Sequence, residues 1–303
     1  MRDPSDEAHL RPFRELLPAT GAGIYLDSAY RGPLPAETHA AMREAEDWEL
    51  RVGRAAEGRD EDFAQKRAEA RAVVAALIGA SPEDIFLSGR PAQIQLQALV
   101  DFETGALQTT SPGAALDATF AAGAVPLDVS TLGADVVWIP GDRWLLGPEG
   151  TGAVWIRPGA PGSHALVREA EFGRTQVLGL ARSVGWLEMY VGLPWIYERG
   201  AMLTRRLHDA LSGTSEVELV TPADALATIL VFRLNSWPVE EALAELRRRV
   251  FAIVGTNDSG GAIRASVAWF NTSEEIDRFA AAVAELARST PETLPRRPTL
   301  LVH

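Results

Sequence analysis

Three charged residues stand on or just after segments that read as β-strands: Asp117, Arg143 and Arg264. A guanidinium stays protonated and its lone pairs are delocalised, so Arg143 cannot form an imine. It can bind a carboxylate or a phosphate through two parallel hydrogen bonds, and the planar fork of Arg264 suits a carboxylate in the same way. A structural reading stays open for each residue: Asp117 as a helix cap, Arg143 as its ion-pair partner, and Arg264 as a surface arginine.

Few other side chains of this chain could perform catalysis. It has no cysteine, which excludes disulfides, thiolate metal sites and a cysteine nucleophile. Of its 29 Lys and Arg residues only Lys66 is a lysine, and its charged neighbours indicate a solvated helix surface. No Gly-x-Ser-x-Gly elbow and no P-loop occurs. The five histidines show no metal-ligand spacing: His9, His39, His164, His208 and His303.

Composition places the chain among globular proteins. Its 303 residues can bury a large core, and a hydrophobic fraction of 47% is ordinary for such a protein. The formal net charge of −12 argues against binding to nucleic acid or to an anionic membrane surface. The charged N-terminus is unlike a signal peptide, and no apolar run approaches the roughly 20 residues of a membrane helix. We therefore expect a cytoplasmic protein without a bound metal.

Apolar periodicity and turn signals predict helices and strands along the whole chain. A capping box of Thr272 and Glu275 marks the start of the last helix, and Ser81 is a candidate N-cap. The expected helices cover residues 36–50, 60–78, 194–211, 239–249 and 273–288. Residues 24–35 read as a short strand and turn, and the other expected strands cover residues 84–88, 93–102, 153–157, 217–220, 228–234, 251–254 and 263–268.

The segment from Asp135 to Gly152, with Trp-Leu-Leu-Gly-Pro at 144–148, closely resembles the cofactor-lysine motif of class V aminotransferases. These fold-type-I enzymes depend on pyridoxal phosphate (PLP) and include cysteine desulfurases and isopenicillin N epimerase. Further resemblance lies at 24–35, at 114–128, at 182–187, which is epimerase-like, and at 263–275. The resemblance implies a PLP-transferase fold, and without a cysteine the desulfurase reading loses its sulfur carrier.

The resemblance also assigns roles to individual positions. Arg143 stands where the family has the lysine that forms the Schiff base with PLP. Asp117 matches the acid that keeps the pyridine nitrogen protonated. Thr175 resembles the threonine that reaches the cofactor phosphate of the neighbouring subunit. Arg264 matches the arginine that binds the substrate carboxylate, and Ser28 belongs to the same substrate side.

Three departures from the family pattern concern the cofactor. Pro140 stands where relatives usually have a phosphate donor, and Phe120 stands where many have a ring-contacting glutamine or histidine. Asp117 follows Ser88 by only 29 positions. The family places at least two βαβ units of about 30 residues each in that interval. The lost block includes the helix N-terminus that binds the phosphate.

We therefore expect an α/β fold of the fold-type-I PLP-transferase type, with a shortened, mostly parallel sheet and a small C-terminal α+β domain. The expected domains are an N-terminal arm (1–35), a shortened large domain (36–195) and a small domain (196–303). The leading hypothesis is a pseudoenzyme without PLP Schiff-base chemistry that still binds an amino-acid-like carboxylate. One alternative is an active PLP-dependent lyase, epimerase or transaminase. The other is a non-catalytic subunit that forms a homodimer or pairs with a full-length paralogue.

Overall fold

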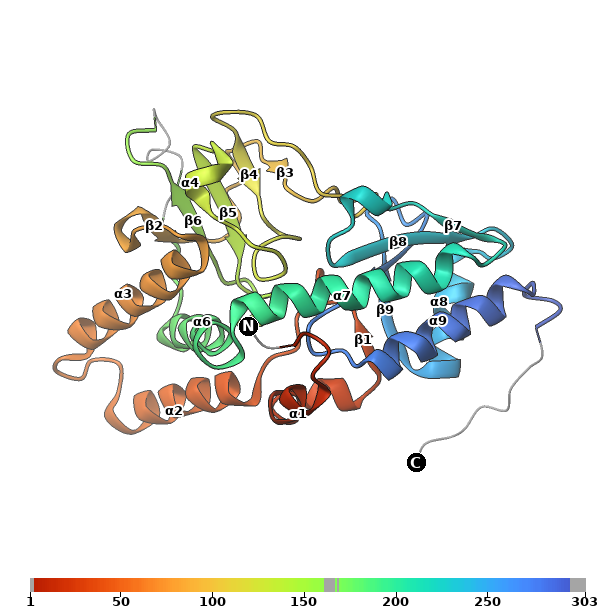
Figure 1. Cartoon of the computed structure of the whole chain (residues 1–303). Helices are drawn as coiled ribbons and strands as arrows, with labels where there is room; N and C mark the ends of the chain where they lie inside the picture. Colours follow the sequence, from red (N-terminus) through yellow and green to blue (C-terminus); the bar gives the residue numbers. More distant parts are fainter. Residues whose placement is uncertain (1–2, 161–166, 168, 295–303) are drawn as a thin grey trace.

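A computed structural model describes residues 3–160, 167 and 169–294 of the chain. It contains two five-stranded sheets with helices packed around them, and the sheets lie towards opposite ends of an elongated molecule (Figure 1). No helix within the described ranges is long and apolar enough to cross a membrane.

The first sheet has the strand order β2-β6-β5-β4-β3. Its β4–β5 and β3–β4 pairings are parallel, whereas β5–β6 and β2–β6 are antiparallel, so the sheet is mixed. Every residue of β5 and β6 is buried, as expected for central strands covered on both faces. The strands are β2 (Ile85–Leu87), β3 (Gln97–Ala98), β4 (Ala115–Asp117), β5 (Val136–Pro140) and β6 (Gly152–Ile156).

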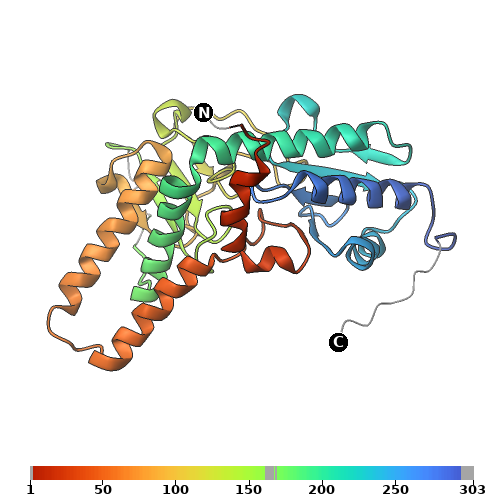
Figure 2. The same cartoon turned by 60° about the horizontal axis from the view of Figure 1, so that its bottom comes forward.

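Three helices lie beside this sheet, and α6 (Arg174–Trp186) packs against both α2 (Ala36–Val52) and α3 (Arg59–Ile78). The three helices form one layer, and the connection between α2 and α3 extends away from the rest of the molecule (Figure 2). Inside the layer the hydroxyls of Thr38 and Ser183 lie 2.7 Å apart, and Ser183 donates to the carbonyl of Leu146. The layer is thereby fixed to the loop that follows β5.

The second sheet has the order β1-β9-β10-β8-β7. Its edge strand β1 comes from the N-terminal part of the chain and pairs in parallel with β9, whereas the other pairings are antiparallel. The expected N-terminal arm therefore contributes a strand to the C-terminal sheet. The strands are β1 (Ile24–Leu26), β7 (Val217–Leu219), β8 (Ile229–Leu234), β9 (Ala252–Thr256) and β10 (Ile263–Ser266).

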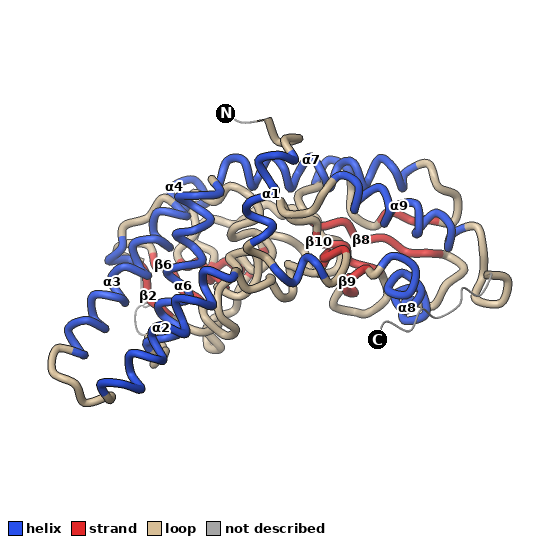
Figure 3. The backbone as a smooth tube through the Cα atoms, turned by 90° about the horizontal axis from the view of Figure 1, so that it is seen from below, coloured by secondary structure: helices blue, strands red, loops and turns tan. Residues whose placement is uncertain are grey.

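Helix α7 (Leu193–Ser212) runs past both sheets (Figures 1 and 3). Its Trp195 and Ile196 belong to the core of the first sheet, whereas Leu203, Leu207 and Leu211 belong to that of the second. The second core is closed by α8 (Val239–Val250) and by α9 (Ser273–Ala287). The remaining helical segments are α1 (Glu7–Glu15), η1 (Pro18–Gly21), η2 (Pro82–Asp84), α4 (Val129–Leu132), the π-helical η3 (Leu187–Val191) and η4 (Ala223–Ala225).

The strand expected at 93–102 is the clearest error of the sequence-based prediction. Only Gln97–Ala98 forms a strand there. A turn from Pro91 to Ile94 precedes it. After it, one carboxylate oxygen of Asp101 accepts hydrogen bonds from the backbone of Glu103 and Thr104, which turns the chain back. The returning residues 106–108 then bond to the 99–101 segment and partly cover the sheet edge.

Other boundaries shift for local reasons. Phe251, expected in a strand, has φ of 55° and caps α8, so β9 begins one residue later. Ser81 precedes η2 but its side chain makes no capping hydrogen bond, contrary to expectation. The capping box of Thr272 and Glu275 at α9 is confirmed.

Candidate functional site

Four loops and strands bring charged and aromatic side chains together between the two sheets. Asp27 and Tyr30 follow β1, Phe120 follows β4, Arg143 follows β5, and Arg264 lies on β10. The strands β4 and β5 are parallel, so their carboxyl ends meet at one sheet edge, where binding sites of α/β folds commonly lie. Two of the sequence-predicted site residues, Arg143 and Arg264, are thus placed around one aromatic ring.

Arg264 is almost completely buried, with 4% of its side chain exposed. Its Nη2 donates to Oδ1 of Asp27 at 3.0 Å. Its guanidinium lies 5.2 Å from the ring centre of Phe120 and 5.8 Å from that of Tyr30, distances at which a cation interacts with an aromatic ring. Its Nε is buried without a hydrogen-bond partner, so one of the donors with which Arg264 could bind a carboxylate is unused.

Arg143 contacts the turn that follows β1. Its Nη1 donates to the carbonyl of Tyr30, and its guanidinium lies 4.9 Å from the centre of the Tyr30 ring. The amide of Gly32 donates to the carbonyl of Asp142 at 3.0 Å, and a Cβ at Gly32 would overlap the carbonyl of Arg143. The two turns therefore pack backbone to backbone, and glycine is required at 32.

Asp27 is a partly buried carboxylate in a cationic environment. Burial raises its pKa above the ordinary value, while Arg264, Arg143 and Arg31 act in the opposite direction. Next to it, Ser28 is fully buried, and its hydroxyl lacks a hydrogen-bond partner. The same holds for Ser266, whose backbone bridges that of Asp27. Ser28 therefore lies beside β10, the strand that carries Arg264.

Asp117 ends β4 and is 1% exposed. Its Oδ1 accepts hydrogen bonds from the backbone amide of Thr119, at 2.9 Å, and from the Thr119 hydroxyl. Its Oδ2 lies 2.8 Å from Nη2 of Arg90, although this contact lacks the orientation of a hydrogen bond. Arg90 comes from the short segment between β2 and β3, and sequence reasoning did not identify it. The structural reading that pairs Arg143 with Asp117 is wrong, because Arg90 holds that place.

Thr175 is not among these residues. It lies in the first turn of α6, where the neighbouring Arg174 pairs with Asp62 at 2.9 Å and stacks on Trp48. That turn therefore packs against the far end of the α2–α3 hairpin. Lys66 lies on α3 and pairs with Glu69 at 3.1 Å.

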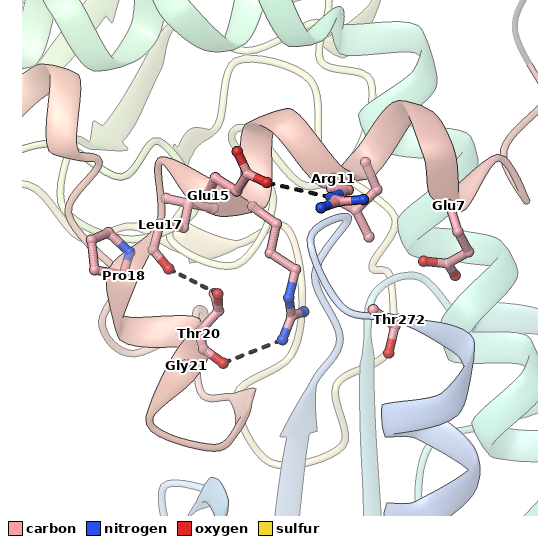
Figure 4. A pocket seen from close by; sticks show the side chains of 10 residues that line it. Glu7, Arg11, Glu15, Leu17, Pro18, Thr20, Gly21 and Thr272 are labelled. Atoms are coloured by element: carbon pink, nitrogen blue, oxygen red, sulfur yellow. Dashed lines mark hydrogen bonds and ion pairs between the residues drawn. The ribbon is translucent and has the colours of Figure 1, made fainter.

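A separate hollow of about 460 Å³ lies beside α1 and η1 (Figure 4). Its lining includes Arg11 and Glu15, which form an exposed pair, and Arg14, which binds Glu275 and the carbonyl of Phe270. These contacts fix α1 to the loop after β10. None of the sequence-predicted site residues lines this hollow. In residues 3–160, 167 and 169–294, no group of three His, Asp or Glu side chains could hold a metal ion.

The residues at the strand ends do not fit PLP in the way that the resemblance implies. Arg143 offers no primary amine, and its guanidinium is bound to Tyr30. The acid Asp117 already has a cation beside it, Arg90. The stretch from 88 to 117, all of it described, contains no helix and so no helix N-terminus for a phosphate.

Known proteins share both sequence and fold with this chain. A probable cysteine desulfurase of Methanothermobacter thermautotrophicus is 24% identical over 210 residues, which cover 57% of this chain and 52% of that protein. The chain spans about half the length of the curated relatives it matches. No family model matches it.

Solved structures match over most of the chain. The apo cysteine desulfurase of Thermococcus onnurineus NA1 superposes with a TM-score of 0.76 at 19% identity, over 95% of this chain and 99% of that one. The cystine C-S lyase C-DES, in complex with its product cysteine persulfide, has a TM-score of 0.72 at 16% identity, over 88% and 99%. The chain therefore has the fold of these cysteine desulfurases, a fold-type-I PLP-transferase fold, and its sequence is similar to those of two probable cysteine desulfurases.

Proposed function

We propose that this protein is a pseudoenzyme of the PLP-transferase fold that performs no Schiff-base chemistry and binds a small carboxylate at Arg264. The observation that carries the proposal is the position of Arg143. A permanently protonated guanidinium replaces the amine of the family motif, and it is bound to the carbonyl and the ring of Tyr30. An arginine held in this way cannot capture an aldehyde.

A cluster of three arginines around the Tyr30 ring supports an anionic ligand. Arg31, Arg143 and Arg264 all have their guanidinium within 6 Å of the centre of the Tyr30 ring. Arg264 keeps an unused Nε donor in a nearly dry environment, where a charge-assisted hydrogen bond is strong. The buried hydroxyls of Ser28 and Ser266 add two further polar groups without partners.

A PLP-dependent lyase is the second candidate. The likeness to the fold of the C-S lyase C-DES favours it, as does the retention of Asp117 at the end of β4. This candidate requires PLP to bind without an internal lysine linkage and to displace Arg90 from Asp117.

Two titrations of the purified chain distinguish the candidates. Under the proposal, PLP added at equimolar concentration does not stay with the protein through gel filtration, whereas stoichiometric retention of PLP would favour the lyase. Ligand-observed NMR with propionate should detect binding, whereas the uncharged isostere propionamide should not bind.

Two variants locate the carboxylate site. Arg264→Gln should abolish propionate binding. Arg233→Gln is the matched control, because Arg233 lies on the adjacent strand β8 and pairs with the exposed Glu218. Equal binding of propionate by the two variants would refute the assignment to Arg264.

A further inference from the structure

Asp27, a residue of the same chain, already binds the guanidinium of Arg264. Its Oδ1 accepts a hydrogen bond from Nη2 of Arg264 at 3.0 Å, and 21% of the Asp27 side chain is exposed, against 4% for Arg264. The pair lies directly over Gly255 of β9. A Cβ at that position would approach Asp27 Oδ1 to 2.7 Å and Arg264 Nη2 to 3.0 Å. The backbone of β9 thus leaves just enough room for this ion pair.

The groups facing Asp27 come from every neighbouring element. Arg264 projects from β10, Arg143 from the loop after β5, and Arg31 from the same turn as Asp27, whereas Tyr25 of β1 interacts with it through its phenol. Only Arg264 forms a hydrogen bond with the Asp27 carboxylate among these contacts. The carboxylate is therefore surrounded by cations but directly bound to one of them.

We propose that Asp27 is an internal carboxylate ligand of Arg264, which an incoming carboxylate must replace, and that it thereby makes ligand binding dependent on proton uptake. This inference rests on the proposed carboxylate site. Two carboxylates cannot both stay ionised on one buried guanidinium at low cost, because like charges repel strongly where water is excluded. When the ligand binds, Asp27 therefore takes up a proton. Asp27 is a specificity-determining residue in this scheme, because it favours ligands whose carboxylate outcompetes its own.

The direction of the pH dependence follows from linkage. Burial already raises the pKa of Asp27 in the free protein, and losing Arg264 while gaining a neighbouring anion raises that pKa further. Between these two pKa values the complex holds one more proton than the free protein. Ligand affinity must then rise as the pH falls through that interval, by up to about tenfold per pH unit.

The test uses trifluoroacetate, a carboxylate that stays ionised over the whole pH range, observed by fluorine NMR with the full-length chain. Wild-type protein should bind it more tightly as the pH falls. Asp27→Asn should bind it about tenfold more tightly than wild type at neutral pH, with little pH dependence. Glu149→Gln is the control for loss of one nearby negative charge, since Glu149 is exposed and only 3.9 Å from Arg31. It should change the affinity less than about twofold.

A second measurement requires no variant. Calorimetry of trifluoroacetate binding to wild-type protein, in two buffers with different ionisation enthalpies, should report net proton uptake. Binding that is independent of pH, without proton uptake and unchanged in Asp27→Asn, would overturn the role of Asp27 and leave the carboxylate site standing. Absence of binding in both wild type and Asp27→Asn would overturn the proposed function and this inference together.

Discussion

The contact between Arg90 and Asp117 allows a quantitative test of how this chain stabilises the acid at the end of β4. Asp117 is 1% exposed, whereas the side chain of Arg90 is 55% exposed, and their charged atoms are 2.8 Å apart. Breaking a fully buried pair costs about 3–5 kcal/mol, and breaking an exposed pair costs about 0–1 kcal/mol. Because only one partner is buried, we expect Arg90→Ala to lower the free energy of unfolding by about 2 kcal/mol.

A double-mutant cycle isolates this interaction. Asp117→Asn removes the negative charge but keeps an oxygen that can accept the hydrogen bonds from Thr119. In that background Arg90→Ala should cost less than about 0.5 kcal/mol, because no buried charge is left without a partner. Urea denaturation gives the free energy of unfolding of all four proteins. In thermal denaturation, Arg90→Ala should lower Tm by about 4–8 °C.

The matched control is Arg54→Ala, an arginine whose side chain is 85% exposed and 3.4 Å from Glu49. It should change stability by less than about 0.5 kcal/mol. A coupling energy near zero between Arg90 and Asp117 would refute the view that the segment between β2 and β3 supplies a counter-ion to the buried acid.

Three further predictions concern the site. Gly255→Ala should destabilise the protein by about 1–3 kcal/mol in chemical denaturation, because its Cβ presses on the Asp27–Arg264 pair, whereas Gly261→Ala on the following turn, with no contact closer than 3.5 Å, should be nearly neutral. Burial raises the pKa of Asp27, so the stability that this group contributes is present below its ordinary pKa of 3.8 and is lost as the pH rises through its folded-state pKa. Plots of unfolding free energy against pH for wild type and Asp27→Asn should therefore diverge between these two pKa values. Parallel plots would contradict this prediction. Arg143→Lys alone should not yield a PLP aldimine band in absorbance spectra, because Arg90 still neutralises Asp117 and the described stretch from 88 to 117 offers no helix N-terminus to the phosphate. A stoichiometric band would show an intact cofactor pocket.

The sequence predicted helices best where the signal comes from residues close together in the chain. Helices α2 and α3 were located within two residues because each carries an extended run of helix-forming residues, and α3 ends at a glycine. The capping box at α9 is equally local, since Thr272 and Glu275 bond to each other's backbone. The strand expected at 93–102 is mostly absent because the Asp101 carboxylate accepts hydrogen bonds from the backbone of Glu103 and Thr104 and turns the chain. Apolar patterning does not predict such a turn.

Sequence reasoning named two residues of this cluster, Arg143 and Arg264, but not their arrangement. The motif around 144–148 identified Arg143, and the resemblance at 263–275 identified Arg264. Their common neighbour Tyr30 and the partner Asp27 are brought together only by the pairing of β1 with β9, which joins residues more than 200 positions apart. Arg90 gave no sequence signal at all, because it lies in an irregular loop. The role of Thr175 and the expected dimer stay predictions.

The most direct test of the central claim is borohydride reduction of the folded protein with excess PLP, followed by mass spectrometry of the intact chain and of its peptides. We predict no stoichiometric pyridoxyl adduct on the folded chain, because position 143 carries a guanidinium and the single lysine, Lys66, is engaged by Glu69 on α3. A single stoichiometric adduct that disappears on unfolding would contradict the account, because it would show that the fold still presents an amine to the cofactor.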